Sequence, residues 1–201
     1  MSNSNPFPYL GNFTKILPYE DMWKHIESCD DWEEVCSALN AHQYETRPQH
    51  EKDHALHYGP HNHLYARTIV KDKGFFSDQW FDAVGADPDG GYFAQIYRTS
   101  PGNIESPHVD FFPSFLGDRD PDGNLWTPES VTEVGKKVIR CWIPLMDGKV
   151  GHILYSDNYA MCDWKLGDVY ELPAGVTHGF VNGGIEDRYV CVFTSWRKNH
   201  T

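Results

Sequence analysis

Two histidines and an aspartate have the types and the spacing of a metal site. His108 and Asp110 stand in the segment SPHVDFF, and His178 follows about 70 residues later. Side chains alternate between the two faces of an extended segment, so His108 and Asp110 point the same way and Val109 points the opposite way. Two imidazoles and one carboxylate, with other coordination positions left open, suit iron(II) and dioxygen. We therefore predict a metal site formed by His108, Asp110 and His178.

The surroundings of His178 make this prediction more specific. An isolated H-x-D occurs often by chance, and a single histidine after a Pro-Gly turn is usually only a turn residue. Here the histidine stands in GDVYELPAGVTHGFVN, whose Gly, Pro, Gly, His and Asn spacing resembles the second cupin motif. In that family the glycine and proline turn one strand into the next, and the histidine projects into the barrel as a metal ligand.

Arg188 lies ten residues after His178 and opens the segment RYVCVFTSW. Both faces of a strand over this segment are mostly apolar, so we expect it to be covered on both sides. An arginine that points into a barrel costs several kcal/mol unless an anion meets it. The distal carboxylate of 2-oxoglutarate can accept two parallel hydrogen bonds from a guanidinium, while its 1-carboxylate and 2-oxo group chelate the metal. The alternative is a surface arginine at a strand end, paired with Glu186 or Asp187.

This combination, H-x-D…H with an arginine ten positions downstream, resembles the iron(II)/2-oxoglutarate-dependent dioxygenase superfamily over residues 92–197. The resemblance implies a double-stranded β-helix, Fe(II) as cofactor, 2-oxoglutarate and O2 as co-substrates, and hydroxylation of a C–H bond with release of succinate and CO2. The segment HGFVNGGIEDRYVCVFTSW is also similar to the last strands of the aspartyl/asparaginyl β-hydroxylase group. In that group an earlier arginine helps to hold the 1-carboxylate of the co-substrate, and Arg140 in KVIRCWIPL matches it.

One residue departs from the β-hydroxylase pattern. That group lacks the metal carboxylate, yet Asp110 is present here. The departure favours kinship with prolyl-hydroxylase-like enzymes and argues against a halogenase, in which the carboxylate is absent to leave room for halide. Tyr97 lies on a predicted strand just before the triad, and we expect it to line the co-substrate pocket, with an ordinary core or surface position as the alternative.

Short segments rich in β-branched and aromatic residues fill the second half of the chain. They are separated by Gly, Pro, Asp and Asn, which predicts a mainly β protein with a double-stranded β-helix (jelly-roll, cupin-like) core flanked by N-terminal helices. We expect one domain over 1–201, with a helical and loop flank at 1–91 and the core at 92–197. The expected strands are YFAQIYRT, KVIRCWIPL, GHILYS, GDVYELP and RYVCVFTSW.

In the flank, residues 19–40 have the apolar periodicity of two short helices broken near Asp30. A further short helix is predicted at Ser77–Val84, with Ser77 or Asp78 as its cap. Residues 41–66 are polar and rich in histidine. We expect them to form a loop; a lid over the pocket and a second metal site are the alternatives.

Composition narrows the classes of partner. The 201 residues are enough for one core, and a net charge of −12 repels phosphate backbones, so no nucleic acid is expected. No apolar run reaches the roughly 18 residues that span a membrane. Five scattered cysteines and an N-terminus without a secretory pattern favour the cytoplasm.

The expected substrate is a small molecule or a peptide or protein side chain. Two other functions remain open on the sequence alone. One is a cupin-type metal dioxygenase or isomerase that does not use 2-oxoglutarate, and the other is a non-catalytic barrel that only binds its ligand. Arg188 separates the first of these from the leading hypothesis, because only a 2-oxoglutarate enzyme needs the arginine for its co-substrate.

Overall fold

The structure is a computed structural model and describes residues 5–29, 33–35, 65–70, 75–110 and 133–198. Most of the predicted 41–66 loop therefore lies outside the described residues. In the described part of the chain, no helix is both long and apolar enough to cross a membrane.

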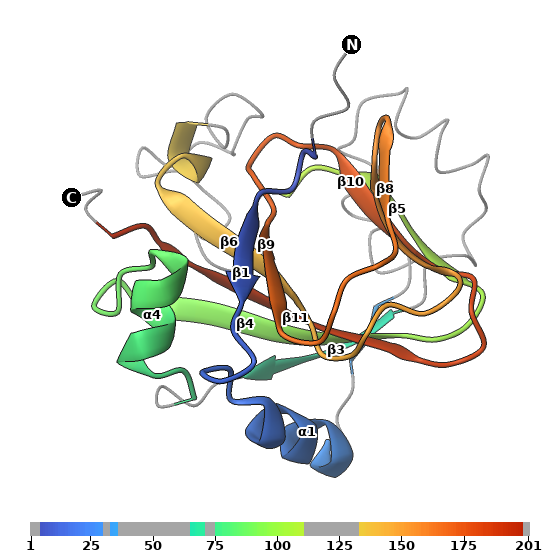
Figure 1. Cartoon of the computed structure of the whole chain (residues 1–201), viewed down its shortest axis with the longest axis horizontal. Helices are drawn as coiled ribbons and strands as arrows, with labels where there is room; N and C mark the ends of the chain where they lie inside the picture. The colour runs from blue at the N-terminus through green and yellow to red at the C-terminus, as the bar shows by residue number, and fades with distance from the viewer. Residues whose placement is uncertain (1–4, 30–32, 36–64, 71–74, 111–132, 199–201) are drawn as a thin grey trace.

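Two antiparallel sheets make up the core of the molecule (Figure 1). The strands of the larger sheet, in spatial order, are β1 (Tyr9–Asn12), β9 (Asp168–Glu171), β6 (Val138–Pro144), β11 (Arg188–Trp196), β4 (Tyr92–Thr99), β3 (Tyr65–Val70) and β2 (Glu33–Val35). The strands of the smaller sheet are β5 (Asn103–His108), β10 (His178–Asn182), β7 (His152–Ser156) and β8 (Tyr159–Met161).

The path of the chain between the sheets defines the fold. From β4 onward the chain alternates between them: β4, β6, β9 and β11 lie in the larger sheet, and β5, β7, β8 and β10 lie in the smaller one. This alternation produces a double-stranded β-helix, a jelly-roll barrel of the cupin type. The predicted fold class is confirmed, and each of the five predicted strand segments contains a strand.

Strand β11 separates two apolar cores. Val190 and Val192 face the interior of the barrel, where they belong to one buried cluster. Cys191 and Phe193 face the opposite side and pack with buried residues of α1 (Tyr19–Ser28) and α4 (Asp78–Val84). Figure 1 shows both helices outside the barrel, on the side of the larger sheet. The strand is thus covered on both faces, as its sequence predicted.

The helix predicted at Ser77–Val84 is confirmed as α4. The Ser77 hydroxyl accepts a hydrogen bond from the Trp80 backbone N–H at 3.4 Å, which caps the first turn. Gly85 ends the helix in the left-handed conformation, at φ 74°.

The prediction of a second helix within 19–40 is wrong at residues 33–35. The first helix is α1, but Glu33–Val35 form β2, which pairs with β3. The hydrogen bonds of the sheet edge outweigh the local helical periodicity there. The rest of the predicted second helix lies outside the described residues. The flank at 1–91 also contributes β1 and β3 to the larger sheet, which an expectation of helices and loops did not include.

Asp168 fastens the N-terminal strand to the barrel. Its carboxylate accepts hydrogen bonds from the Tyr9 hydroxyl at 3.1 Å, from Asn12 Nδ2 at 2.9 Å and from the Lys165 backbone N–H at 2.7 Å. The Asp168 side chain is buried, whereas the three donor residues are exposed, so these bonds lie at the boundary of the barrel. Strand β1 pairs with β9, and β9 leads into the turn before β10. The network therefore holds the strand from which that turn starts.

Replacing Asp168 with alanine should lower the free energy of unfolding by about 2 kcal/mol, because the hydrogen bonds that its buried carboxylate accepts are lost together. Urea denaturation measures the loss. The exposed Asp21 pairs with Lys24 across one turn of helix α1, and Asp21→Ala should have a much smaller effect than Asp168→Ala. Equal losses for the two variants would contradict the role given to Asp168.

Candidate metal centre

The pairing of β5 with β10 brings the two histidines together. His108 and His178 are direct partners in the antiparallel register, and their ring centroids lie 4.6 Å apart. Asp110 follows two residues after the end of β5. Its Oδ1 lies 3.7 Å from His108 Nε2, and its Oδ2 lies 3.5 Å from His178 Nε2. One ligand atom from each of the three residues lies within 4.8 Å of the others, a spacing that could hold a metal ion.

The turn before β10 fixes the orientation of His178. Gly175 adopts φ 80°, a conformation that residues with a side chain rarely reach, and lets the chain reverse between β9 and β10. His178 Nδ1 lies 3.0 Å from the Val176 carbonyl oxygen, which fits donation of its N–H to that oxygen. Nε2 then faces Asp110 as the neutral, basic nitrogen that a metal requires.

The protonation states of the triad also favour a cation. Burial lowers the pKa of His178, despite the opposing charge of Asp110, so the ring is neutral at pH 7. Burial would raise the pKa of Asp110, but the positive charge of Arg140, together with the two histidines, outweighs it and holds that pKa below its usual range. A carboxylate and a neutral imidazole are the forms that bind metal ions.

Arg140 contacts the carboxylate of the triad. Its Nε lies 2.6 Å from Asp110 Oδ2, and its NH1 donates to Thr194 Oγ1 at 3.0 Å. Both members of the ion pair are 13% exposed. Burial alone would lower the pKa of Arg140. The negative charge of Asp110, with smaller contributions from other nearby acids, outweighs this effect and raises that pKa above its usual value. The structure thus places Arg140 beside the triad, in direct contact with Asp110; its predicted contact with a co-substrate carboxylate stays a prediction.

Arg188 is a buried cation with two nitrogen atoms that meet no acceptor. The residue is 2% exposed, and NH2 donates to Thr99 Oγ1 at 3.0 Å. The guanidinium carbon lies 4.7 Å from the centroid of the Phe180 ring, in a cation–π contact. Nε and NH1 have no hydrogen-bond partner among the described residues. Burial lowers the pKa of Arg188 to about 10, and the charge of Glu105 opposes this shift.

These contacts exclude the surface position considered for Arg188. Glu186, one of the two acids that would have paired with it, is the ion-pair partner of Lys149 instead. The burial inferred from the apolar pattern of β11 is confirmed, and the role of Arg188 as an anion ligand stays a prediction.

One pocket inside the barrel contains both histidines of the triad and both arginines. Tyr97 also lies in its wall, where its hydroxyl donates to Gln95 Oε1 at 2.7 Å. The free volume is about 20 Å³, room for roughly one water molecule. The lining residues are Tyr97, Thr99, Glu105, His108, Arg140, Leu172, His178, Phe180, Arg188, Val190 and Val192.

Glu105 is the charged pocket residue that the sequence interpretation missed. Strict alternation along β5 would put it on the face opposite His108. The register shows otherwise, because His108 pairs with His178 and Glu105 pairs with Phe180. Three residues of β5 thus span two residues of β10, and this bulge returns Glu105 to the inner face. Its Oε1 lies 3.7 Å from His108 Nε2.

Tyr155 and Gly179 support this bulge from the neighbouring strands. The Tyr155 hydroxyl donates to the Glu105 carbonyl oxygen at 3.1 Å, across Gly179, which is its register partner. A Cβ at position 179 would lie 2.5 Å from the Tyr155 oxygen, so glycine is required for the hydroxyl to pass. The carbonyl freed by the bulge therefore has a donor, and β5 keeps its shape beside the triad.

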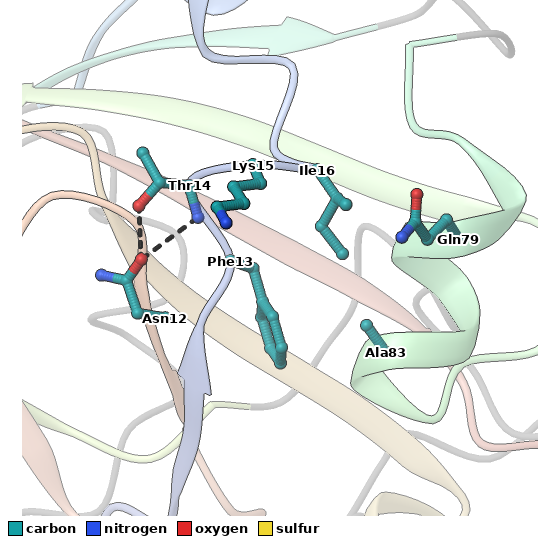
Figure 2. A pocket seen from close by; sticks show the side chains of 7 residues that line it. All are labelled: Asn12, Phe13, Thr14, Lys15, Ile16, Gln79 and Ala83. Carbon is teal, nitrogen blue, oxygen red and sulfur yellow. Dashed lines mark hydrogen bonds between the residues drawn. The ribbon is translucent and has the colours of Figure 1, made fainter.

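A second hollow lies outside the barrel, between the segment that follows β1 and helix α4 (Figure 2). Asn12 Oδ1 accepts hydrogen bonds there from the Thr14 backbone N–H and from the Thr14 hydroxyl. Lys15 is the charged residue of its lining, and the lining includes no residue of the triad. The lining of this hollow contains no histidine, cysteine or carboxylate, so the pocket inside the barrel is the candidate metal site.

No family model and no curated protein sequence matches the chain. Similar solved structures include a cupin 2 conserved barrel domain protein from Salinispora arenicola, with 18% identity and a TM-score of 0.36 over 65% of this chain and 75% of that one. KdgF from Halomonas sp. has 12% identity and a TM-score of 0.37 over 67% of this chain and 81% of that one. A predicted oxalate decarboxylase from Thermotoga maritima has 11% identity and a TM-score of 0.37 over 66% and 81% of the two chains. These values are too low to carry an argument about activity.

Breaking the buried ion pair should be costly. Asp110→Asn should lower the free energy of unfolding by about 3 kcal/mol, because it leaves the Arg140 guanidinium buried beside a neutral group. Adding Arg140→Met removes the unpaired charge, so the double variant should recover at least part of the loss. Urea denaturation of the two single variants and the double variant, all without added metal, measures this coupling. Strictly additive losses would mean that the two side chains do not interact.

Proposed function

We propose that the protein is an Fe(II)- and 2-oxoglutarate-dependent oxygenase that hydroxylates an unactivated C–H bond of its substrate and releases succinate and CO2. The observation that carries the proposal is the pairing of two features in one pocket. The two histidines of a two-histidine, one-carboxylate cluster line the same pocket as Arg188, a buried guanidinium with two nitrogen atoms turned to no acceptor among the described residues. A metal ion alone would explain the cluster of two histidines and a carboxylate. An anionic co-substrate would explain the buried guanidinium of Arg188.

The donor set fits iron(II). His108, His178 and Asp110 would hold the ion, and three protein ligands leave positions for a chelating co-substrate and dioxygen. When bound, iron and 2-oxoglutarate supply the oxidising chemistry, and the chain supplies orientation and shielding from water. Leu172, Phe180 and the two valines of β11 give the pocket its apolar walls.

The charges of the pocket favour a dianion. A divalent cation and two guanidinium groups bring four positive charges, and the carboxylates of Asp110 and Glu105 cancel two of them. A ligand with two negative charges would neutralise the remainder, and 2-oxoglutarate carries two carboxylates. Its distal carboxylate would accept hydrogen bonds from the free nitrogen atoms of Arg188, which is the geometry that arginine serves best.

Binding of both partners requires a rearrangement. The free volume of about 20 Å³ does not admit 2-oxoglutarate, so side chains must move as it enters. Arg140 is placed to do so, because a cation at the triad would compete with it for Asp110. Once released, its guanidinium could meet the 1-carboxylate of the co-substrate, the role implied by the resemblance to the β-hydroxylase group.

The same resemblance favours a peptide or protein side chain as substrate, with a small molecule as the other class. We also propose that the enzyme acts in the cytoplasm. The four described cysteines, Cys29, Cys141, Cys162 and Cys191, are free thiols, which suits a reducing compartment.

Replacement of Arg188 tests the proposal against a barrel that binds metal without 2-oxoglutarate. Arg188→Met should weaken 2-oxoglutarate binding by about 100-fold and leave Fe(II) binding unchanged, because a bidentate ion pair is lost while all three metal ligands are kept. Anaerobic titration of the Fe(II)-loaded protein, followed by the visible absorption of the chelate, measures both affinities. Succinate release across candidate substrates then measures turnover.

Arg197→Gln is the matched control. Arg197 forms its ion pair with Glu171 and does not line the pocket, so its loss should leave 2-oxoglutarate affinity within about twofold of the unmodified protein. If Arg188→Met and Arg197→Gln bind 2-oxoglutarate equally well, the co-substrate assignment fails. Absence of 2-oxoglutarate binding by the unmodified protein would leave a metal-binding barrel of another kind.

A further inference from the structure

In the function proposed above, Glu105 enters only as one of the two carboxylates in the charge balance of the pocket. It lines the pocket on the inner face of β5, and its side chain is 22% exposed. Among the described residues its ion-pair contact is with His108, at 3.7 Å between Oε1 and Nε2. Asp110 Oδ1 lies at the same 3.7 Å from that nitrogen atom, yet Asp110 has Arg140 as a close cationic partner. The charge of Glu105 also acts on the buried guanidinium groups of Arg140 and Arg188, so an anion that reaches those groups meets this carboxylate as well.

The register places Glu105 on the Arg188 side of the triad. Its partner across the sheet is Phe180, and the guanidinium of Arg188 lies over the Phe180 ring. His108, the proposed metal ligand on the same strand, pairs with His178, which is the first residue of β10. Glu105 therefore lies beside the path between the triad and Arg188. A ligand that chelates the metal and also reaches Arg188 must pass along this carboxylate.

We propose that Glu105 determines the charge selectivity of the co-substrate pocket, by weakening the binding of a dicarboxylate relative to a 2-oxo acid without a distal carboxylate. This inference rests on the proposed function, because it assumes a ligand that spans the triad and Arg188. The physical reason is like-charge repulsion in a partly buried pocket, where water screens charges less than at the surface. Arg188 attracts the distal carboxylate, and Glu105 sets a limit on that attraction.

The charge near Arg188 supports this assignment. Glu105 is the acid whose negative charge acts on the buried Arg188 guanidinium, against the effect of burial. In this position it offsets part of the cost of burying the arginine. The same charge must oppose any second carboxylate that approaches the guanidinium. One residue would thus stabilise the empty pocket and lower its affinity for a dianion.

A comparison of two ligands on Fe(II)-loaded protein isolates the effect. The ligands are 2-oxoglutarate and 2-oxopentanoate, which share a five-carbon chain and the chelating end but differ in the distal carboxylate. Glu105→Gln should bind 2-oxoglutarate about tenfold more tightly than the unmodified protein and 2-oxopentanoate with unchanged affinity. Glu105→Asp keeps the charge and should retain the unmodified preference. Anaerobic titration with each ligand, read by visible absorption, provides the affinities.

Two controls separate charge from other effects. Glu133→Gln removes one negative charge from an exposed residue that pairs with Lys136, and should change neither affinity. Titration of each variant with Fe(II) alone tests whether Glu105 is instead a fourth metal ligand. A loss of Fe(II) affinity of tenfold or more in Glu105→Gln would overturn the proposal in favour of that role.

An unchanged ratio of 2-oxoglutarate to 2-oxopentanoate affinity in Glu105→Gln would also overturn it. Failure of the proposed function has a different pattern. In that case Arg188→Met has no effect on 2-oxoglutarate affinity, or 2-oxoglutarate binds to neither the unmodified protein nor Glu105→Gln, and both proposals fall together. If Arg188 is required and Glu105→Gln has no effect, only the selectivity proposal fails.

Discussion

The antiparallel pairing of β5 with β10 sets the positions of three polar side chains in the pocket, His108, His178 and Glu105. It makes His108 and His178 direct neighbours and, through the bulge in β5, turns Glu105 inward as well. The pairing depends on a glycine at position 179, because the Tyr155 hydroxyl crosses that point to reach the carbonyl that the bulge leaves without a strand partner. A small irregularity in one ladder thus decides that the charge of Glu105 enters the barrel.

The need to compensate buried charges is the second constraint. The barrel compensates Asp110 and Arg140 well and Arg188 poorly. Asp110 and Arg140 compensate each other at 2.6 Å, whereas Arg188 has a hydroxyl, an aromatic ring and the more distant charge of Glu105. Burial lowers the pKa of Arg188 only to about 10, so the group keeps its charge at pH 7. A permanently charged, partly satisfied guanidinium in an apolar pocket is destabilising unless a ligand meets it. This imbalance is what points from a metal site towards an anionic co-substrate.

The sequence predicted strands correctly where the alternation of apolar residues within a segment matches the burial of its two faces. Alternation in RYVCVFTSW predicted a strand covered on both faces, and the structure places Val190 and Cys191 in opposite cores. Pattern failed where distant pairing decides the outcome. The strand at Glu33–Val35 exists because β3 lies beside it, and Glu105 faces inward because β5 has a bulge. The spacing of residues within a segment shows neither which strand will pair with it nor which face a side chain takes after a bulge.

The contact between Asp110 and Arg140 links the stability of the barrel to its readiness for metal. As the pair stands, the arginine compensates the carboxylate that the triad needs and holds it ionised. A cation that binds there replaces one positive partner with another, so Asp110 never becomes a buried charge without compensation. The exchange would also weaken the contact of Arg140 with Asp110, inside a pocket that already contains Arg188. Metal binding would therefore raise the positive charge available to a second ligand, so that the metal and an anionic co-substrate are expected to bind cooperatively.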